Sequence, residues 1–478
     1  MGLTTEGAAT GGIETGTIYS IPHAHRHGRS RDLFTVWFGS NMMMLTIVTG
    51  ALATTVFHLS PVVGLLSVVA GNLVGAVFMA LHAAQGPGLG VPQMVQTRGQ
   101  FGSLGAVPVT VLMVVMYVGF AASNLVLGGE GLQSMTPGLG RMPGILIIAA
   151  LVVPPVIWGY RLIHAATRLM TVLCGGAVLL SLLWVGVRAG GTVAWMSGGA
   201  SVTGVLGAFS VSALWQIAYA PYVSDYSRYM PADERGMRMA FHATYWGTVL
   251  GSVLPMALGV VLGGLAHGGP VVATMSGLLG PVATPVMVIL SVGIAVTDAM
   301  NVYCGTLSSL TVLQTFWPHA RFGLGWRLAM AVVLMVAALL MALFFAGSFM
   351  ESYTEFLNLL MAVLVPWTAI NLVDYYLVRH GAYDVDSFFH ADGGIYGYVN
   401  GPALICYVVG IAVQVPFLSN GLYTGPLARA MGGVDLSWLV GLAVTAPLYL
   451  WMAVRAGLTD VSGTMPDGGA RIAAGNGL

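Results

Sequence analysis

Stretches of about 20 apolar residues with few or no charges recur along the chain from Leu33 to Ala453. Each is long enough to cross a hydrocarbon core of about 30 Å as an α-helix, which satisfies its own backbone hydrogen bonds inside a bilayer. Of the 478 residues, 57% are hydrophobic and 7% are charged, whereas a soluble domain carries roughly 25% charged residues. The sequence therefore predicts an all-α, polytopic membrane protein.

Twelve of these segments are predicted to span the membrane, with a polar tail at each end. The tails are residues 1–32 and 456–478, and the first has no apolar signal sequence, so insertion is expected to begin at the first span. The predicted spans are residues 33–56, 62–84, 106–128, 144–160, 167–188, 203–223, 241–266, 280–303, 326–348, 356–378, 402–418 and 436–455.

Arginine placement predicts the orientation, because the chain contains no lysine and short cytoplasmic loops tend to hold the positive charges. With the N-terminus inside, only Arg141, Arg188 and Arg429 fall outside. The cytoplasmic arginines are then Arg26, Arg29, Arg31, Arg98, Arg161, Arg168, Arg228, Arg235, Arg238, Arg321, Arg327, Arg379, Arg455 and Arg471. We expect a multi-pass protein of the cell membrane with both termini in the cytoplasm.

Several classes of function find no support in the residue pattern. Cys174, Cys304 and Cys406 stand alone inside apolar segments, without the spacing of metal ligands or redox pairs, and are expected to pack in the core. No basic run suggests nucleic acid as a partner. No HExxH sequence, paired catalytic cysteines or nucleophile elbow suggests a membrane-embedded enzyme.

Two predicted spans are interrupted. The first reads LFTVWFGSNMMMLTIVTGALA, with Gly39, Ser40 and Asn41 inside an apolar run, and the sixth reads ALWQIAYAPYVSDYSRYMP, where Pro221 removes a backbone donor. Transporters expose backbone groups at mid-membrane by such breaks, although Gly and Pro also mark simple kinks. Because the breaks lie five spans apart, residues 33–188 and 203–378 are predicted to be two inverted repeats, followed by two extra helices in residues 402–455.

Polar and aromatic side chains recur near the middle of three spans. The eighth span places Thr297, Asp298 and Asn301 on one arc of its helix, and an acid at that depth is costly and usually functional. In the third span, Phe120 and Asn124 are four residues apart and point the same way. The alternative is that the polar arc only hydrogen-bonds neighbouring helices.

The sixth span repeats this theme with Trp215 and Tyr219, and Gln216 lies beside them. A flat heterocycle binds where aromatic faces stack on it and amides read its edge. Taken singly, each aromatic is equally explained by packing or by interfacial anchoring.

The loop after the sixth span is the most charged part of the chain, and the tenth span ends on Asp374 and Arg379 in a similar way. These charges either form a solvated face with local ion pairs or act as a gate that makes and breaks such pairs. The charged residues of the loop are Asp225, Arg228, Asp233, Glu234, Arg235 and Arg238.

Four stretches resemble the nucleobase:cation symporter-1 family, and within it the purine-cytosine permease branch. They are PQMVQTRGQFGSLG from Pro92, AYAPYVSDYSRYMP from Ala218, TDAMNVYCGTLS from Thr297 and PWTAINLVDYYLVRHGAYD from Pro366, and similarity in span order extends along nearly the whole chain. The resemblance implies a LeuT-like fold of five plus five inverted helices and two peripheral ones. It also implies alternating access, with the substrate between helices 1, 6, 3 and 8.

The resemblance assigns residues to this site. The substrate-facing positions of the family fall on Met43, Phe120, Asn124, Trp215 or Tyr219, and Asp298 or Asn301. A family sodium site falls on the carbonyls of Gly39, Met42 and Gly293 and on two adjacent positions, Val296 and Thr297, that carry hydroxyls in relatives.

Two departures from the family affect the coupling ion. Val296 supplies no side-chain oxygen, so a sodium ion would lose part of its shell. Asp298 stands where relatives often have Asn, and a carboxyl in a low-dielectric cavity can hold a proton and release it when the cavity opens. Sodium and proton coupling both remain open, and no other cofactor is expected.

The function expected from these residues and from the resemblance is import of a purine or cytosine, driven by a cation gradient. The alternatives keep the fold and change the cargo to hydantoin, allantoin, uracil or a vitamin-like heterocycle. A channel of similar architecture is the remaining membrane alternative.

Overall fold

The computed structural model describes residues 17–458 apart from residues 137, 190, 192 and 422. Within that range the chain is built from helices, and the only β-type pairings are two isolated bridges, Leu59 with Gly199 and Ser419 with Thr424. The predicted all-α class is confirmed.

The α-helices vary from five to 34 residues in length. Their bounds are α1 Ser30–Asn41, α2 Met44–Thr55, α3 Pro61–Leu89, α4 Gln93–Phe101, α5 Ala106–Met135, α6 Arg141–Trp158, α7 Tyr160–Ala189, α8 Val202–Ile217, α9 Val223–Ser227, α10 Glu234–Leu265, α11 Val271–Leu279, α12 Ala283–Phe316, α13 Leu324–Phe345, α14 Phe349–Val373, α15 Gly401–Gln414, α16 Pro426–Ala430 and α17 Ser437–Arg455. The short 3-10 and π segments are η2 His23–His25, η3 Ala220–Tyr222, η4 Gly280–Val282, η5 Ala346–Ser348, η6 Asp374–Val378, η7 Asp386–Phe389, η8 Gly394–Tyr396 and η9 Val415–Phe417.

Each predicted span coincides with a helix or a pair of helices. Among the described residues, ten helices are long and apolar enough to cross a membrane, and α1 with α2 qualifies as a pair bent by 58°. The shorter apolar segment Gly401–Phe417 lies where the eleventh span was predicted. These elements account for all twelve predicted spans.

Several helices run beyond their predicted bounds, among them α5, α7, α10, α12 and α14. α12 continues to Phe316 where the prediction ended at residue 303, and α10 begins at Glu234 where it began at residue 241. The added part of α12 is polar, with Thr306, Thr311 and Gln314 buried in the protein. It packs on α4, whose nine residues are all buried. The prediction ended early because it followed apolarity alone, whereas polar residues buried against protein also continue a helix.

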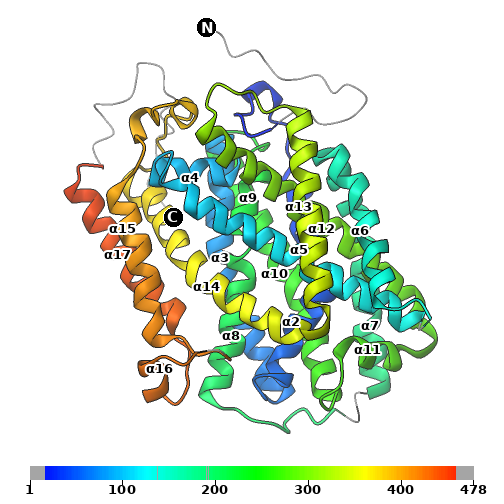
Figure 1. Cartoon of the computed structure of the whole chain (residues 1–478). Coiled ribbons are helices and arrows are strands. Elements are labelled where there is room, and N and C mark those ends of the chain that lie inside the picture. Colours follow the sequence, from blue (N-terminus) through cyan, green and yellow to red (C-terminus); the bar gives the residue numbers. More distant parts are fainter. Residues whose placement is uncertain (1–16, 137, 190, 192, 422, 459–478) are drawn as a thin grey trace.

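The helices form two groups and a peripheral pair (Figure 1). α10 packs on α1, α2 and α3, and α3 packs on α8, so both interrupted spans belong to one group. In the second group, α12 packs on α5, α6, α7 and α13. α15 and α17 pack on each other and on α14 at one side of the molecule, as expected of two extra helices.

The described part of the predicted N-terminal tail packs against the helices. The Gly28 amide donates to the Tyr229 carbonyl at 2.7 Å, and the Ile21 amide donates to the Gly90 carbonyl at 2.9 Å. Arg228 reaches the Thr17 carbonyl at 3.0 Å. Residues 17–29 therefore close one end of the molecule, across α3 and α9, whereas residues 1–16 and 459–478 of the two predicted tails lie outside the described residues.

Candidate functional site

The first interrupted span breaks at Met42 and Met43. Met42 has φ −79° and ψ 65°, and Met43 is extended, so neither continues the helix between α1 and α2. The Ser40 carbonyl at the end of α1 accepts a hydrogen bond from the Thr297 hydroxyl at 3.2 Å. The break thus presents backbone oxygen to α12, as the polar arc of the eighth span requires.

The second interrupted span breaks at Pro221. α8 ends at Ile217, a 3-10 turn covers Ala220–Tyr222, and α9 follows for one further turn. The Pro221 carbonyl accepts a hydrogen bond from the Tyr117 hydroxyl of α5 at 2.8 Å. Both predicted breaks are present. At each break, a backbone carbonyl accepts a hydrogen bond from a side chain of the second group of helices.

A small closed cavity of about 10 Å³, room for roughly one water molecule, lies between the two breaks. It is lined by Met43, Phe120, Asn124, Trp215, Ala218, Tyr219, Tyr222, Thr297 and Asn301. Seven of these nine residues were predicted from the sequence to contact substrate or cation, and the two additions are Ala218 and Tyr222. The structure therefore brings together residues that lie more than 250 positions apart in the chain.

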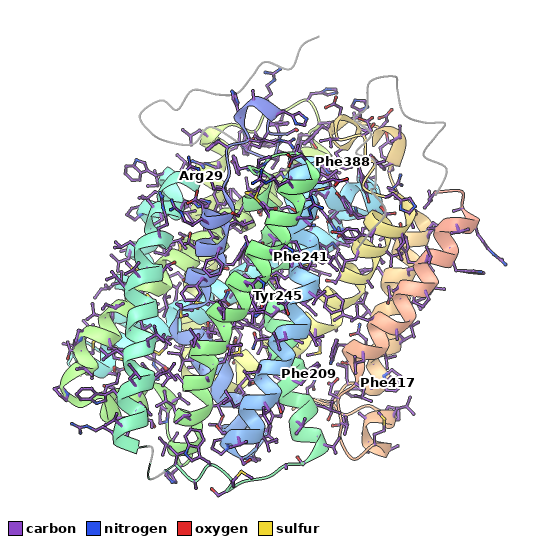
Figure 2. All side chains as sticks on the ribbon, turned by 180° about the vertical axis from the view of Figure 1, so that it is seen from behind. Arg29, Phe209, Phe241, Tyr245, Phe388 and Phe417 are labelled. Atoms are coloured by element: carbon purple, nitrogen blue, oxygen red, sulfur yellow. The ribbon has the colours of Figure 1, made fainter. Side chains whose placement is uncertain are left out.

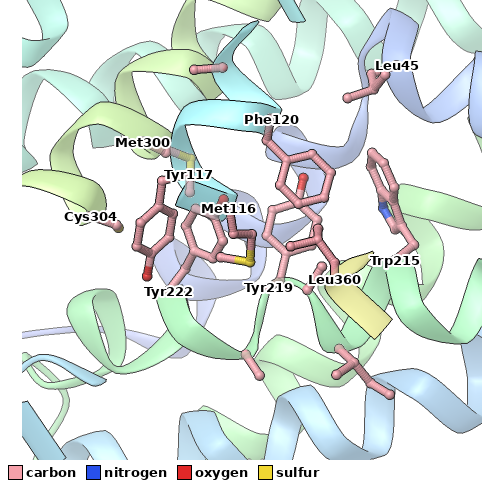
Figure 3. Packing of buried hydrophobic residues seen from close by; sticks show 14 of the residues in the cluster. Leu45, Met116, Tyr117, Phe120, Trp215, Tyr219, Tyr222, Met300, Cys304 and Leu360 are labelled. Carbon is pink, nitrogen blue, oxygen red and sulfur yellow. The ribbon is translucent and has the colours of Figure 1, made fainter. Parts of the chain in front are cut away.

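Aromatic rings form one wall of this cavity (Figure 3). Phe120 meets Trp215 edge to face with ring centroids 6.1 Å apart, and Trp215 meets Tyr219 at 5.9 Å. Tyr219 and Tyr222 are 5.4 Å apart, which continues the wall from α8 into η3. Phe356 of α14 lies against Phe120 at 5.2 Å, so the tenth span covers this wall from outside the lining.

Amide, carboxyl and hydroxyl groups form the facing wall. Asn124 donates from Nδ2 to Asp298 Oδ1 at 2.8 Å, and Asn301 donates to the same oxygen at 3.2 Å. The Tyr222 hydroxyl donates to Asn301 Oδ1 at 2.7 Å. Asp298 is fully buried behind the lining, where it holds the two amides that face the cavity.

Two oxygens of this polar wall have no donor within the described residues. They are Asn124 Oδ1 and Asp298 Oδ2, each with almost no solvent-exposed surface. Buried acceptors without a partner are costly, and they occur where a ligand or proton completes the hydrogen bonding. The wall is therefore complementary to a molecule that brings N–H or O–H donors.

Gln216 does not line the cavity, although the sequence suggested it as a substrate residue. Its amide nitrogen donates to Asn72 Oδ1 and to the Ser252 hydroxyl at 3.0 Å, and its carbonyl oxygen accepts from Thr248. These partners belong to α3 and α10, so Gln216 faces the opposite side of α8 from Trp215 and Tyr219. Adjacent positions on a helix are about 100° apart, which separates the two faces.

Asn41 is a site neighbour that sequence reasoning treated only as part of the break. Its Oδ1 accepts from the Trp215 indole at 2.7 Å and from the Ser252 hydroxyl at 2.9 Å. Asn41 thereby fixes the ring of Trp215 against the end of α1. Tyr222 was missed because it follows Pro221, where helical spacing no longer indicates which residues share a face.

The positions proposed for a cation surround the first break on the α12 side. The Met42 carbonyl lies 3.9 Å from where a Cβ of Gly293 would be, which places these two residues side by side. The Gly39 carbonyl already accepts from the Met42 amide at 3.1 Å. Val296 is buried and offers no side-chain oxygen, so Thr297 is the sole side-chain oxygen donor among the five predicted cation residues.

The charged residues after the sixth span divide into two kinds. Asp225 and Arg228 are buried, and Asp225 accepts from the Gln93 amide at 2.9 Å. Asp374 is likewise buried and pairs with Arg379 at 3.2 Å, while the Tyr449 hydroxyl donates to it at 2.7 Å. The members at the start of α10 are exposed, namely Asp233, Glu234, Arg235 and Arg238. Only the buried residues, Asp225, Arg228, Asp374 and Arg379, are placed to hold helices together.

Similarity to known proteins agrees with this architecture. Residues 20–441 match a family described as permease for cytosine/purines, uracil, thiamine, allantoin. A putative purine-cytosine permease of Bacillus subtilis, YxlA, is 36% identical over 447 residues, covering 91% of this chain and 95% of that protein. The purine-cytosine permease fcyB of Emericella nidulans is 26% identical, covering 93% of this chain and 89% of that protein.

Solved transporters share the fold. The structure of Mhp1, a nucleobase-cation-symport-1 family transporter in a closed conformation with bromovinylhydantoin bound, superposes with a TM-score of 0.73 at 19% identity. It covers 92% of this chain and 96% of its own. A Na+-coupled sialic acid symporter superposes with a TM-score of 0.62 at 12% identity, covering 91% of both chains. The predicted LeuT-like fold is confirmed.

These similarities also settle the class of protein. The family match covers most of the chain, and a permease moves its solute across a membrane without changing it chemically. The expectation of a transporter and not an enzyme is confirmed. The chain belongs to the nucleobase:cation symporter-1 family, the permeases for cytosine/purines, uracil, thiamine and allantoin.

Proposed function

We propose that this permease imports a purine or cytosine by alternating access, coupled to a cation. The observation that carries the proposal is the cavity between the two helix breaks, with aromatic rings on one wall and amide and carboxyl groups on the other. Relatives named as purine-cytosine permeases support the choice of cargo. In this closed arrangement the cavity holds about one water, so the walls must part before a flat ring with polar edges can lie against Phe120 or Trp215.

The edge of the ring is read by the free acceptor of Asn124. Asn124 Oδ1 has no donor within the described residues and its side chain lines the cavity, whereas Asp298 lies behind the lining and its free Oδ2 is the oxygen that would bind a proton. Cytosine and adenine carry an exocyclic amino group, and every purine carries a ring N–H. A nucleobase that brings an N–H donor therefore completes the polar wall, and a molecule that offers only acceptors leaves Asn124 Oδ1 unpaired.

We propose a proton as the coupling ion, carried by Asp298. Within the described residues no cationic side chain pairs with this acid, and its direct partners are the two neutral amides. A buried carboxylate without a counter-charge is unfavourable, and protonation removes the charge. The ionisable side chains that line the adjoining cavity are Tyr219 and Tyr222, and a tyrosine hydroxyl is neutral at physiological pH.

The sodium alternative depends on Thr297. Its hydroxyl already donates to the Ser40 carbonyl, and Val296 contributes no oxygen beside it. A sodium ion there would be held mainly by the carbonyls of Gly39, Met42 and Gly293. Thr297→Ala should weaken sodium stimulation of uptake if sodium is the coupled ion, and it should leave uptake insensitive to sodium if the ion is a proton.

The membrane arrangement follows from the arginine distribution. We propose that both termini lie in the cytoplasm of a cell bounded by this membrane and that residues 17–29 close the cytoplasmic end. We also propose that residues 33–188 and 203–378 are the two inverted repeats, because each begins with a broken span and both breaks meet at the cavity. Residues 402–455 are then the peripheral helices.

Thermal stabilisation of the purified protein tests the cargo. Cytosine, adenine, hypoxanthine, uracil, allantoin and hydantoin are added singly, with and without sodium, because a ligand that binds only the folded state raises its melting temperature. We expect cytosine or a purine to stabilise most, independently of sodium. Stabilisation by hydantoin or allantoin alone would contradict the proposed cargo, and stabilisation only with sodium would contradict proton coupling.

A further inference from the structure

A second hollow lies outside the transport site, at the end of the molecule closed by residues 17–29. It is a groove between α1 and α10 with a volume of about 570 Å³. Its lining residues are Ser30, Arg31, Phe34, Arg235, Arg238, Met239, His242, Ala243 and Trp246. The groove is far larger than the closed cavity between the breaks, and it shares no residue with that cavity.

The groove is cationic at its outer end. Arg31 comes from the first turn of α1, and Arg235 and Arg238 come from the first two turns of α10. All three are exposed, and none of their guanidinium groups forms an ion pair or a hydrogen bond with another described residue. Three guanidinium groups around one groove attract an anion that is large enough to meet them together.

The lining changes from charged to apolar along the helix axis. From Arg235 to Trp246 is eleven residues, or about 16 Å along α10. Trp246 is 49% exposed, and Phe34, three residues after Arg31 on α1, also lines the groove. The guanidinium groups lie outermost and the aromatic rings lie deeper. A phospholipid requires this order, because its phosphate lies at the membrane surface and its acyl chains point inward.

The inner end of the groove is closed by direct contact of the two helices. A Cβ at Gly247 would lie 2.8 Å from the Phe34 carbonyl, and one at Gly251 would lie 2.7 Å from the Phe38 carbonyl. α1 and α10 therefore touch backbone to backbone below the groove, and among the described residues no ion pair joins them at the level of the arginines. Figure 2 shows Phe241 and Tyr245, which stack at 6.1 Å on the neighbouring face of α10.

We propose that this groove binds an anionic phospholipid, whose phosphate lies among Arg31, Arg235 and Arg238 and whose acyl chains lie along Phe34 and Trp246. The lipid joins the outer ends of α1 and α10 and stabilises the group of helices that holds both broken spans. This inference depends on the protein being membrane-embedded and not on the identity of its cargo.

The test measures lipid binding to the purified full-length protein. The melting temperature is recorded in detergent after titration with phosphatidylglycerol, with phosphatidylcholine and with inorganic phosphate. The same titrations are run on an Arg235→Gln/Arg238→Gln variant and on a matched Arg321→Gln control, since Arg321 is another exposed arginine but does not line the groove. Lipid retained by each protein is counted by native mass spectrometry.

Phosphatidylglycerol is expected to stabilise the unmodified protein and the control, and phosphatidylcholine and phosphate are expected to have little effect. Removing two arginines should weaken phosphatidylglycerol binding by about thirtyfold, because each arginine near an anionic lipid surface contributes about 1 kcal/mol. Equal stabilisation of the double variant would overturn the proposal. So would equal stabilisation by phosphatidylcholine, which indicates a general lipid effect, or by phosphate, which indicates a site for free anions.

A second measurement keeps the test decisive if the double variant is unstable. Phosphatidylglycerol with brominated acyl chains quenches tryptophans that its chains contact, so the unmodified protein is compared with Trp246→Phe. The quenched fraction should fall in Trp246→Phe, and brominated phosphatidylcholine should quench both proteins equally. An unchanged fraction with the anionic lipid would contradict the placement of its chains along Trp246.

Discussion

At the scale of single residues, Asp298 combines two properties that rarely occur together. It is fully buried in the middle of the α-helix α12, and its partners are neutral amides, of Asn124 and Asn301. One of its oxygens has no donor within the described residues. Burial opposes its charge, and in the proton coupling that we propose, the acid holds a proton in the closed state and releases it when water reaches the cavity.

Replacing the acid by its amide tests this role. In Asp298→Asn no proton is carried, so the variant should lose concentrative uptake and should still exchange substrate across the membrane. In the unmodified protein, uptake should fall as the external pH rises, because fewer transporters then load a proton. The variant should show a flat pH profile. A profile identical to that of the unmodified protein would exclude Asp298 as the proton carrier.

Asn124 provides a second test at this scale. Asn124→Ala removes a donor to Asp298 and an acceptor that faces the cavity. The loss of a hydrogen bond to an ionisable group costs about 1–3 kcal/mol, so substrate binding should weaken roughly 10- to 100-fold. Binding is measured by thermal stabilisation. Ser123→Ala is the matched control, because the Ser123 hydroxyl bonds only its own helix at Gly119 and should leave binding unchanged.

The sequence indicated most of the lining, because helical spacing and the family motifs both hold on regular helices. The sequence did not indicate where side chains point at the ends of helices. Gln216 is adjacent to Trp215 and yet faces α3 and α10, and Tyr222 enters the cavity only because the chain turns at Pro221. The direction of a side chain after such a turn depends on tertiary contacts, here the hydroxyl of Tyr117 on the Pro221 carbonyl.

At the scale of helices, the packing of α10 on the first span depends on small residues. Gly251 lies against the backbone of α1, where an added Cβ would be 2.7 Å from the Phe38 carbonyl. In membranes such contacts supply much of the association between helices. They also hold α1 in the position that presents its last carbonyls to α12.

Gly251→Ala should therefore lower stability. Overpacking of this kind costs about 1–3 kcal/mol, and the melting temperature in detergent should fall accordingly. Gly264→Ala on the same helix is the control, since its Cβ would meet only Pro61 Cγ at the ordinary distance of 3.4 Å. Equal melting temperatures for the two variants would show that the α1–α10 contact adapts without cost.

Run length and composition predicted the spans well and α4 not at all. α4 is short and polar, and it is buried because Arg98 bonds partners from distant segments, including the Phe388 carbonyl at 2.7 Å and Thr315 at 2.8 Å. Burial lowers the pKa of Arg98 to about 10, which leaves the guanidinium charged at physiological pH. A helix stabilised by long-range hydrogen bonds has no signature in local apolarity.

At the scale of the whole molecule, the cavity is separated from one end by packed residues that must part during transport. Cys304 lies on α12 one turn beyond Asn301, is fully buried, and is 4.0 Å from the Tyr226 hydroxyl of α9. Beyond α9, residues 17–29 close the end of the molecule. Opening of this end would bring water to Cys304.

Thiol labelling follows that opening. In a Cys174→Ser/Cys406→Ser variant, Cys304 is the sole cysteine, and a polar maleimide should label it slowly at rest. Labelling should accelerate during exchange of substrate, because the end closed by residues 17–29 then opens in every cycle. A labelling rate that is the same with and without exchanging substrate would contradict opening at this end.

The central claim is that this chain is a nucleobase carrier that exposes one site alternately to the two sides of the membrane. Counterflow in proteoliposomes tests it most directly: vesicles are preloaded with unlabelled cytosine, and uptake of labelled cytosine at low external concentration is followed. We predict transient accumulation well above that in unloaded vesicles, because return of the loaded site is faster than return of the empty one. Uptake that preloading does not accelerate would contradict a carrier and favour a channel.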